Sequence, residues 1–433
     1  MKRALVLLAV SAATLMTALP ARAVQGTTVR VSEAFGGGDA TSNSNWPSVS
    51  ADGRYVAFSS WASNLVPNDT NDESDVFVRD LMTGTTTLVS VASDGTQANG
   101  VSFTPSISGN GDVVAFRSDA TNLIANDTEG HTDVFVHVIS TGVTSRVSQT
   151  PTGEGANEDS SEPAISANGR VVAFSSVATN LVRVHVNATG LCCDIFVHKL
   201  ATGRNKLGDP MLNGKGASDS FLPVLSANGR YLAFGSWGCD IATGIECLDE
   251  SNVYEQDMRT KTMTLVTRAY SGTVGFGCGA NPAISADGTK VAFISDGANL
   301  VPGDTNGAYD VFVRDLTTGV TTRVSVNSHG GQTNGGLGRV TMSSDGNLIA
   351  FQSDAWNIVP NDDNLVQDIF VHDMKTGKTT RASVSSSGAE ADAYSANAAI
   401  SADGSVVAFE SDAGNLVESD QNITTDIFAH SPA

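Results

Sequence analysis

Short apolar runs and polar turns alternate along this chain, and they return in a fixed order. An apolar–Ser–x–Asp/Asn–Gly phrase has its glycine at positions 53, 111, 169, 229, 288, 346 and 404, so successive units are 58 to 60 residues long. A regular period of this length is typical of repeat folds in which each unit is one small sheet. Seven such units fill residues 24–433 and leave no length for a second domain.

Each unit reads as four strands. In the first unit, residues 47–50 lead into an Asp-Gly pair, which is a strong hairpin signal, and residues 54–60 form the next apolar run. A polar loop precedes the run at 75–79, and a Thr-Gly turn precedes the run at 85–91. β-Branched residues between regularly spaced turns, without helical periodicity, predict an all-β fold. The sequence therefore predicts a seven-bladed β-propeller of four-stranded antiparallel blades.

The two ends of the chain predict how the ring closes. The last unit stops after its third strand, at 426–430, and residues 27–32 match the fourth-strand phrase at 321–325. We expect the N-terminal strand to complete the last blade, which closes the ring and leaves no exposed sheet edge.

The order of the repeat phrases resembles the TolB-type β-propeller repeat over essentially the whole of residues 24–433. The phrases are apolar-Ser-x-Asp-Gly, then Ala-Phe-x-Ser, then Asp-Val-Phe-Val. The resemblance implies a propeller, but these motifs form the turns and the core of a blade and specify no function. The chain departs from the family's namesake in having seven units and no separate N-terminal domain.

The N-terminus and the charge suggest where the protein works. A basic start at Lys2 and Arg3, an apolar run and an Ala-Arg-Ala pattern ending at Ala23 predict a cleaved signal peptide over residues 1–23. The net charge is −21, from 25 basic and 46 acidic residues. This balance disfavours nucleic acid and acidic membrane surfaces as partners. We expect a secreted or periplasmic monomer without membrane insertion.

Acidic loops recur between the second and third strands of five units. Asp, Asn and Asp side chains at i, i+2 and i+6 could supply oxygen ligands to calcium, or they could cap turns by bonding nearby backbone amides. The candidate calcium ligands are Asp69, Asn71, Asp75, Asp127, Asp133, Asp304, Asn306, Asp310, Asp362, Asn364, Asp368, Asp420, Asn422 and Asp426.

The third and fourth units have cysteines in place of the acidic loop, and a fifth cysteine follows in the next unit. In an exported chain such residues favour disulfides over zinc, although an odd number leaves one thiol unpaired. The cysteines are Cys192, Cys193, Cys239, Cys247 and Cys278.

Tryptophans offer a candidate binding surface. Trp61 and Trp237 share one repeat position after the second strand, and Trp356 lies two positions later in its unit. Amphipathic rings on a polar rim suit contact with a sugar or a peptide, and the other interpretation is that they cover the ends of the blades.

The function predicted from these features is non-catalytic binding of a protein, peptide or extracellular glycan through the acidic long-loop face. The chain has no Gly-x-Ser-x-Gly, phosphate-loop or His-Glu-x-x-His motif. The alternative is a metal-assisted polysaccharide lyase or hydrolase with its site in the central channel. Glu162 and Arg339, which break the repeat at the start of inner strands, are the residues that such a site would use.

Overall fold

The structure is a computed structural model that describes residues 26–125, 127, 130–183, 193–210, 219–238, 241, 250–273, 275 and 277–432. The predicted signal peptide and three of the cysteines, Cys192, Cys239 and Cys247, lie outside these ranges. Within them, no helix is long and apolar enough to cross a membrane.

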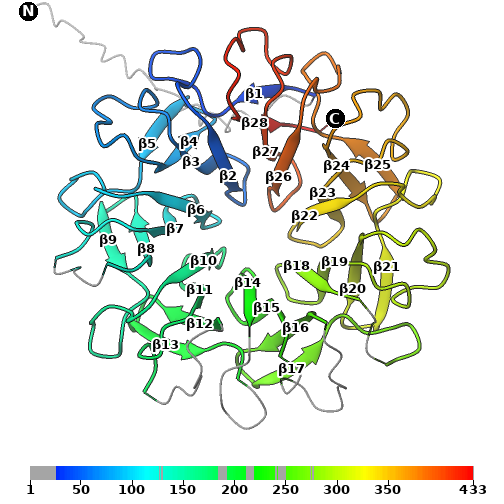
Figure 1. Cartoon of the computed structure of the whole chain (residues 1–433), viewed down its shortest axis with the longest axis horizontal. Helices are drawn as coiled ribbons and strands as arrows, with labels where there is room; N and C mark the ends of the chain where they lie inside the picture. Colours follow the sequence, from blue (N-terminus) through cyan, green and yellow to red (C-terminus); the bar gives the residue numbers. More distant parts are fainter. Residues whose placement is uncertain are drawn as a thin grey trace, which may run out of the picture.

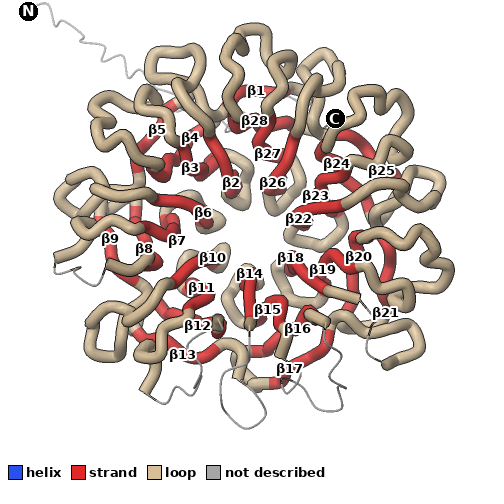
Figure 2. Tube along the Cα trace, viewed as in Figure 1, coloured by secondary structure: helices blue, strands red, loops and turns tan. Residues whose placement is uncertain are grey.

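Seven four-stranded antiparallel sheets form a ring, as predicted (Figures 1 and 2). We number the blades by the order of their inner strands. Blade 1 is β2 (Ser44–Val49), β3 (Tyr55–Ser60), β4 (Asp75–Asp80) and β5 (Thr85–Leu88); blade 2 is β6 (Ser102–Ile107), β7 (Val113–Ser118), β8 (Asp133–Val138) and β9 (Val143–Arg146); blade 3 is β10 (Ser160–Ile165), β11 (Val171–Ser176), β12 (Asp194–Lys199) and β13 (Arg204–Leu207); blade 4 is β14 (Ser220–Leu225), β15 (Tyr231–Ser236), β16 (Asn252–Asp257) and β17 (Thr262–Leu265); blade 5 is β18 (Gly279–Ile284), β19 (Lys290–Ser295), β20 (Asp310–Asp315) and β21 (Val320–Arg323); blade 6 is β22 (Leu337–Met342), β23 (Leu348–Ser353), β24 (Asp368–Asp373) and β25 (Lys378–Arg381); blade 7 is β26 (Ser395–Ile400), β27 (Val407–Ser411), β28 (Asp426–His430) and β1 (Thr28–Arg30).

The last blade is completed by the first strand of the chain, which confirms the predicted closure. β1 pairs antiparallel with β28, with Thr28 opposite His430 and Arg30 opposite Phe428. The Ser32 hydroxyl donates to the Asp426 carboxylate, and the Ile427 amide donates to the Ser32 hydroxyl. Sequence ends almost 400 residues apart are therefore joined through backbone and side-chain hydrogen bonds.

The core between neighbouring blades is built from repeated phenylalanines. In blade 1 the rings of Phe58 and Phe77 stack with centroids 5.8 Å apart, and both side chains are fully buried. The same second-strand and third-strand pair recurs in every blade, with Tyr254 in place of the second phenylalanine in blade 4. Offset ring pairs at this spacing stabilise a sheet beyond their buried area.

The Asp-Gly and Asn-Gly turns form a closed circle on the short-turn face. Gly53 has φ +73°, a conformation that favours glycine. Each turn donates a backbone hydrogen bond to the next turn around the ring. The amide of Ala51 donates to the Gly109 carbonyl, and the seventh bond of the series, from the amide of Ala402 to the Ala51 carbonyl, closes the circle. The blades are therefore held in register on this face, while the long loops lie on the opposite face.

The inner strands carry an irregularity that positions side chains near the ring axis. The pairing of first and second strands shifts in register in every blade. At this bulge the residues Trp46, Thr104, Glu162, Leu222, Asn281 and Asn397 have φ between +48° and +58°. Blade 6 differs, because Arg339 at the equivalent position is not among the positive-φ residues and Gly338 precedes it. A Cβ on Gly338 would lie 2.0 Å from the Gln352 amide nitrogen, so glycine makes room for that side chain.

Candidate functional site

The acidic loops pair with a cation that was not predicted from the sequence. This cation is an arginine at the end of the fourth strand. Arg146 lies 3.2 Å from Asp127 and 3.0 Å from Asp133. Arg323 lies 3.1 Å from Asp304 and 3.6 Å from Asp310. In the same way Arg381 contacts Asp362 and Asp368, and Arg30 contacts Asp420, Asp426 and Asp39. A buried guanidinium thus neutralises the carboxylates in four of the five loops.

The asparagines of these loops hold the turn together. The Asn71 side chain donates to the Asp75 carboxylate and to the Ala98 carbonyl, and its oxygen accepts from the Glu73 amide. Asn306, Asn364 and Asn422 make the corresponding bond to the third-strand aspartate. This geometry supports the turn-capping interpretation. Calcium binding by these loops stays a prediction.

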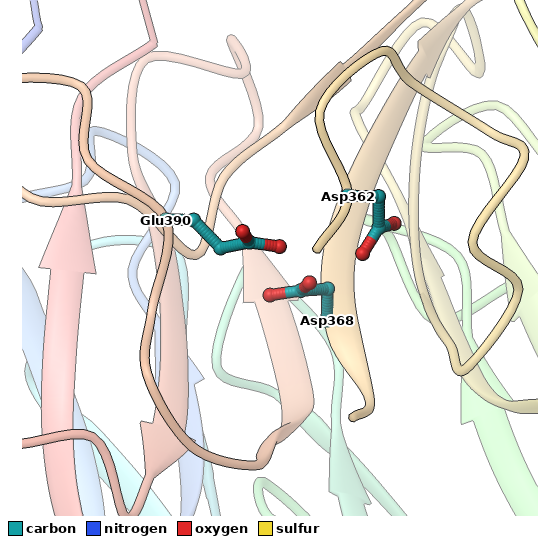
Figure 3. A group of neighbouring side chains, drawn as sticks. All are labelled: Asp362, Asp368 and Glu390. Carbon is teal, nitrogen blue, oxygen red and sulfur yellow. The ribbon is translucent and has the colours of Figure 1, made fainter. Parts of the chain in front are cut away.

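Three carboxylates in blade 6 come closest to a metal-ligand arrangement among the described residues. Single oxygen atoms of Asp362, Asp368 and Glu390 all lie within 4.8 Å of one another. Figure 3 shows Glu390 reaching toward the two aspartates from the neighbouring loop. Arg381 forms an ion pair with each of the three. Burial raises the pKa of Asp362 to about 6 although the Arg381 charge lowers it.

Blade 1 is the exception, because Leu88 takes the place of the arginine. The Gln97 amide donates to Asp69 at 2.6 Å and to Asp75 at 2.8 Å. Burial raises the pKa of Asp75 to about 6 and also raises the pKa of Asp69, against the effect of these hydrogen bonds. The acidic pair of this blade is therefore held by neutral amides rather than by a guanidinium.

The described residues do not test the predicted disulfides. Cys278 is a half-buried free thiol in the structure, and the sequence leaves one of the five cysteines unpaired. Cys193 precedes β12, and Cys192, Cys239 and Cys247 lie outside the described residues. Disulfides among the five cysteines, with the connectivity left open, stay a prediction.

The three predicted tryptophans are exposed but are not brought together. The exposed fractions of Trp61, Trp237 and Trp356 are 42, 48 and 60%. Trp61 lies against Phe103 of blade 2, with ring centroids 5.8 Å apart, and Arg117 lies 5.6 Å above the Phe103 ring. These rings could serve as contact surfaces, but they belong to different blades.

A more coherent group lies near the ring axis. The Arg339 guanidinium of blade 6 is 5.6 Å from the centre of the Trp46 ring of blade 1, which is a cation–π distance. Blade 7 separates these two blades, and the strands that carry the residues, β22 and β2, lie on the inner side of the ring on either side of β26 (Figure 1). Both residues are exposed. Desolvation by the surrounding wall lowers the pKa of Arg339, and the charges of Glu410 and Glu162 raise it.

Two carboxylates complete this axial group, and both bind backbone amides of the following blade. Glu410 accepts from the Trp46 amide at 3.1 Å and from the Asn397 side chain at 2.7 Å. Glu162 accepts from the Leu222 amide at 2.6 Å. The axial group is defined as Trp46, Glu162, Arg339, Asn397 and Glu410. Of these, Glu162 and Arg339 were expected from the sequence, whereas the partners of Arg339 and Glu162 were not.

Four histidines lie away from this group and have structural roles. Each is buried in the third strand, and its Nδ1 lies 2.8 to 2.9 Å from a polar side chain of the fourth strand. The four pairs are His137–Thr144, His198–Asn205, His372–Thr379 and His430–Thr28. Burial lowers the pKa of all four imidazoles.

Comparison with known proteins shows the architecture. No protein-family model matches the chain, and no curated protein matches it. Similar solved structures include TolB from Acinetobacter baumannii, at 14% identity and a TM-score of 0.42, over 80% of this chain and 64% of that one. The chain therefore spans less than two thirds of that TolB.

Two other solved propellers match more of the fold. An oligogalacturonate lyase in complex with manganese has 12% identity and a TM-score of 0.55, over 94% of this chain and 98% of that one. The β-propeller domain of the Trilobed protease from Pyrococcus furiosus has 10% identity and a TM-score of 0.53, over 90% and 95%. Likenesses at this identity show the fold alone: the chain is a seven-bladed β-propeller whose structural neighbours include TolB proteins.

Proposed function

We propose that this protein is an exported, non-catalytic binding propeller that holds its ligand at the axial group. The observation that carries the proposal is the exposed Arg339 guanidinium over the exposed Trp46 ring. Arg339 has neither an ion pair within 4.0 Å nor a hydrogen bond to any part of the chain that the structure describes. Its donors are available to a ligand, next to an aromatic surface.

The chemistry of the axial group favours an extracellular glycan over a protein or peptide. Arg339 and the amide of Asn397 offer donors, the carboxylate of Glu162 offers acceptors, and Trp46 offers an apolar face with 39% of its surface exposed. Sugar hydroxyls both donate and accept, so they match a mixed set of this kind. A ring face against an indole adds apolar contact.

Binding fits the two axial carboxylates better than acid–base catalysis. Glu162 accepts from the Leu222 amide and from the Ser175 hydroxyl, and Glu410 accepts from the Trp46 amide. Both carboxylates thereby fix the bulges of the next blade. The bond from the Trp46 amide to Glu410 holds the Trp46 backbone at φ +58°, so this carboxylate positions the contact surface.

The location of the protein is part of the proposal. The basic and apolar pattern of residues 1–23 and the net charge of −21 support export and a soluble state. The acidity does not supply the contact surface, because most of the loop carboxylates are buried beside arginines.

The test uses a panel of neutral and acidic oligosaccharides from cell walls and extracellular polysaccharides, with the protein immobilised. We expect one class to bind, and we expect Arg339→Ala and Trp46→Ala each to weaken that binding about tenfold or more. Trp356→Ala is the matched control, because it removes a more exposed tryptophan outside the axial group. Binding that survives both axial substitutions, or that falls only in the control, would overturn the proposal.

A further inference from the structure

The outer seam between neighbouring blades has one residue position that changes from seam to seam. Two positions are compared at each seam. The first lies three residues after the fourth strand of one blade, and the second is the fifth residue of the third strand in the next blade. This second residue is a histidine, an arginine or a glutamine. At two seams both positions are charged: Glu33 with Arg79, and Arg268 with Arg314. At the other seams the first residue is uncharged: Val91 with His137, Gln149 with His198, Pro210 with Gln256, Val326 with His372 and Val384 with His430.

The seam between blades 7 and 1 shows how an arginine at this position is neutralised. Arg79 Nη1 donates to the Thr86 hydroxyl at 3.0 Å, and Arg79 Nη2 donates to the Glu33 carboxylate. The side chain of Arg79 is 11% exposed and that of Glu33 is 39% exposed. The pair lines a surface cavity together with residues of β1 and of the Thr-Gly turn.

The seam between blades 4 and 5 has the same arrangement, but its first position holds the positively charged Arg268 where the other seam has the negatively charged Glu33. Arg314 Nη1 donates to the Thr321 hydroxyl at 2.9 Å. Arg314 Nη2 lies 3.6 Å from the Cβ position of Gly319, as Arg79 Nη2 lies 3.6 Å from that of Gly84. The two arginines therefore have the same orientation. Where Arg79 pairs with a carboxylate, however, the equivalent seam position beside Arg314 holds Arg268, whose positive charge lowers the pKa of Arg314.

The two guanidiniums have no carboxylate partner in the described residues. Arg268 donates to the Gly272 carbonyl at 2.7 Å, and neither arginine forms an ion pair within 4.0 Å. Both are half-buried. Burial lowers the pKa of Arg314, the charge of Arg268 lowers it further, and the nearby Asp315 raises it.

We propose that Arg268 and Arg314 form a binding site for an oxyanion, a carboxylate, sulfate or phosphate group carried by a ligand, at the seam between blades 4 and 5. The bound oxyanion takes the place that the Glu33 carboxylate has at the seam between blades 7 and 1. Two guanidiniums recognise such groups through paired N–H donors. This site is separate from the axial group and does not depend on the proposed glycan binding.

The test measures the melting temperature of the full chain with sodium sulfate, phosphate or acetate, at an ionic strength held constant with sodium chloride. An anion that binds only the folded protein raises its melting temperature. We expect a rise of about 1 to 3 °C for at least one of the three anions over chloride. The anion that acts best identifies the chemical group.

Substitutions at the two equivalent seams decide the outcome. In Arg268→Glu the seam acquires the ion pair of blade 1, so we expect a higher melting temperature without added anion and no anion-specific rise. Glu33→Arg copies the arginine pair into blade 1 and should add a second anion-dependent rise. An equal response of wild type and Arg268→Glu, or no response of the wild type to any anion, would overturn the proposal.

Discussion

The carboxyl of Asp209 in blade 3 occupies the position of the Ser148 hydroxyl in blade 2. Ser148 donates a hydrogen bond to Asp133, the first residue of the third strand. Its counterpart in blade 3 faces Asp194, and both aspartates of that blade are buried. Burial first and the charge of Asp194 second raise the pKa of Asp209 well above its ordinary value. Blade 3 thus places a second carboxyl beside the first residue of the third strand, where the other blades place a hydroxyl.

The Asp194–Asp209 pair leads to a prediction about how the stability of the protein depends on pH. A carboxyl with a raised pKa in the folded state binds its proton more tightly there than in the unfolded chain, so its contribution to stability falls as the pH rises above the ordinary aspartate pKa. We expect Asp209→Ser to raise the free energy of unfolding at pH 7.5 by about 1 to 3 kcal/mol. At pH 4 the gain should be much smaller.

Urea unfolding at the two pH values checks this prediction. Ser148→Asp is the reciprocal control, since it places a second carboxyl beside Asp133. It should lower stability more at pH 7.5 than at pH 4. A gain for Asp209→Ser that does not change with pH would contradict the explanation.

The buried arginine of the acidic loops makes a second prediction. Arg146 is 5% exposed and pairs with Asp127 and Asp133, which are 7% and 1% exposed. Removing one partner of a buried ion pair leaves uncompensated charge, so we expect Arg146→Leu to lower the free energy of unfolding by about 3 to 5 kcal/mol at pH 7.5. The loss should shrink toward pH 4, where the two carboxyls can take up protons.

Urea unfolding across this pH range measures the effect. Arg204→Leu, which replaces an exposed arginine at the start of β13, is the matched control and should change the stability by less than about 0.5 kcal/mol. If the loss in Arg146→Leu were the same at both pH values, lost packing rather than unpaired charge would explain it.

The repeat fixed most of the fold in advance, because its turn phrases and its Ala-Phe pairs recur in every unit. Gly53 and the equivalent glycines mark turns that need positive φ, and Phe58 and its counterparts fill the core. These features depend on neighbouring residues in the chain, so a pattern is enough to find them. The blade count and the closure by residues 27–32 followed from the same regularity.

The partners of the charged side chains were harder to predict, because folding brings them together. Arg381 follows Asp362 by 19 residues, and the fourth strand places its guanidinium against the loop. Arg339 and Glu162 stood out as breaks in the repeat. Glu410 did not, because the equivalent second-strand position differs in most blades, from Ser59 to Arg117 to Gln352, and gives no regular pattern to break.

If calcium stabilises the protein, we expect it to bind at one acidic loop, that of blade 1. Arginines pair with the acidic loops of blades 2, 5, 6 and 7, whereas Asp69 and Asp75 of blade 1 are held by side-chain amides and, at Asp75, by the Ser90 hydroxyl, with no ion pair in the described residues. Any rise in melting temperature between excess chelator and millimolar calcium should therefore disappear in Asp69→Asn and in Leu88→Arg. Asp304→Asn is the control that should keep the rise. If the rise were lost in Asp304→Asn instead, the arginine loops would be the calcium sites.

The last prediction concerns the effect of removing β1, the strand that closes the ring. A chain that begins at residue 33 lacks β1, so Asp420 and Asp426 lose Arg30, and the Ile427 amide loses the Ser32 hydroxyl. The edge of β28 also becomes exposed. We expect a loss of about 3 kcal/mol or more in the free energy of unfolding, relative to a chain that begins at residue 27.

A peptide of residues 26–33 distinguishes closure from a general effect of truncation. Added to the shortened chain, it should bind as the fourth strand of blade 7 and raise the melting temperature with peptide concentration. The same peptide with Arg30→Ala should act more weakly, because it leaves both buried aspartates without a cation. Equal rescue by the two peptides would show that backbone pairing alone closes the ring, and no rescue by either would show that β1 must be part of the chain as it folds.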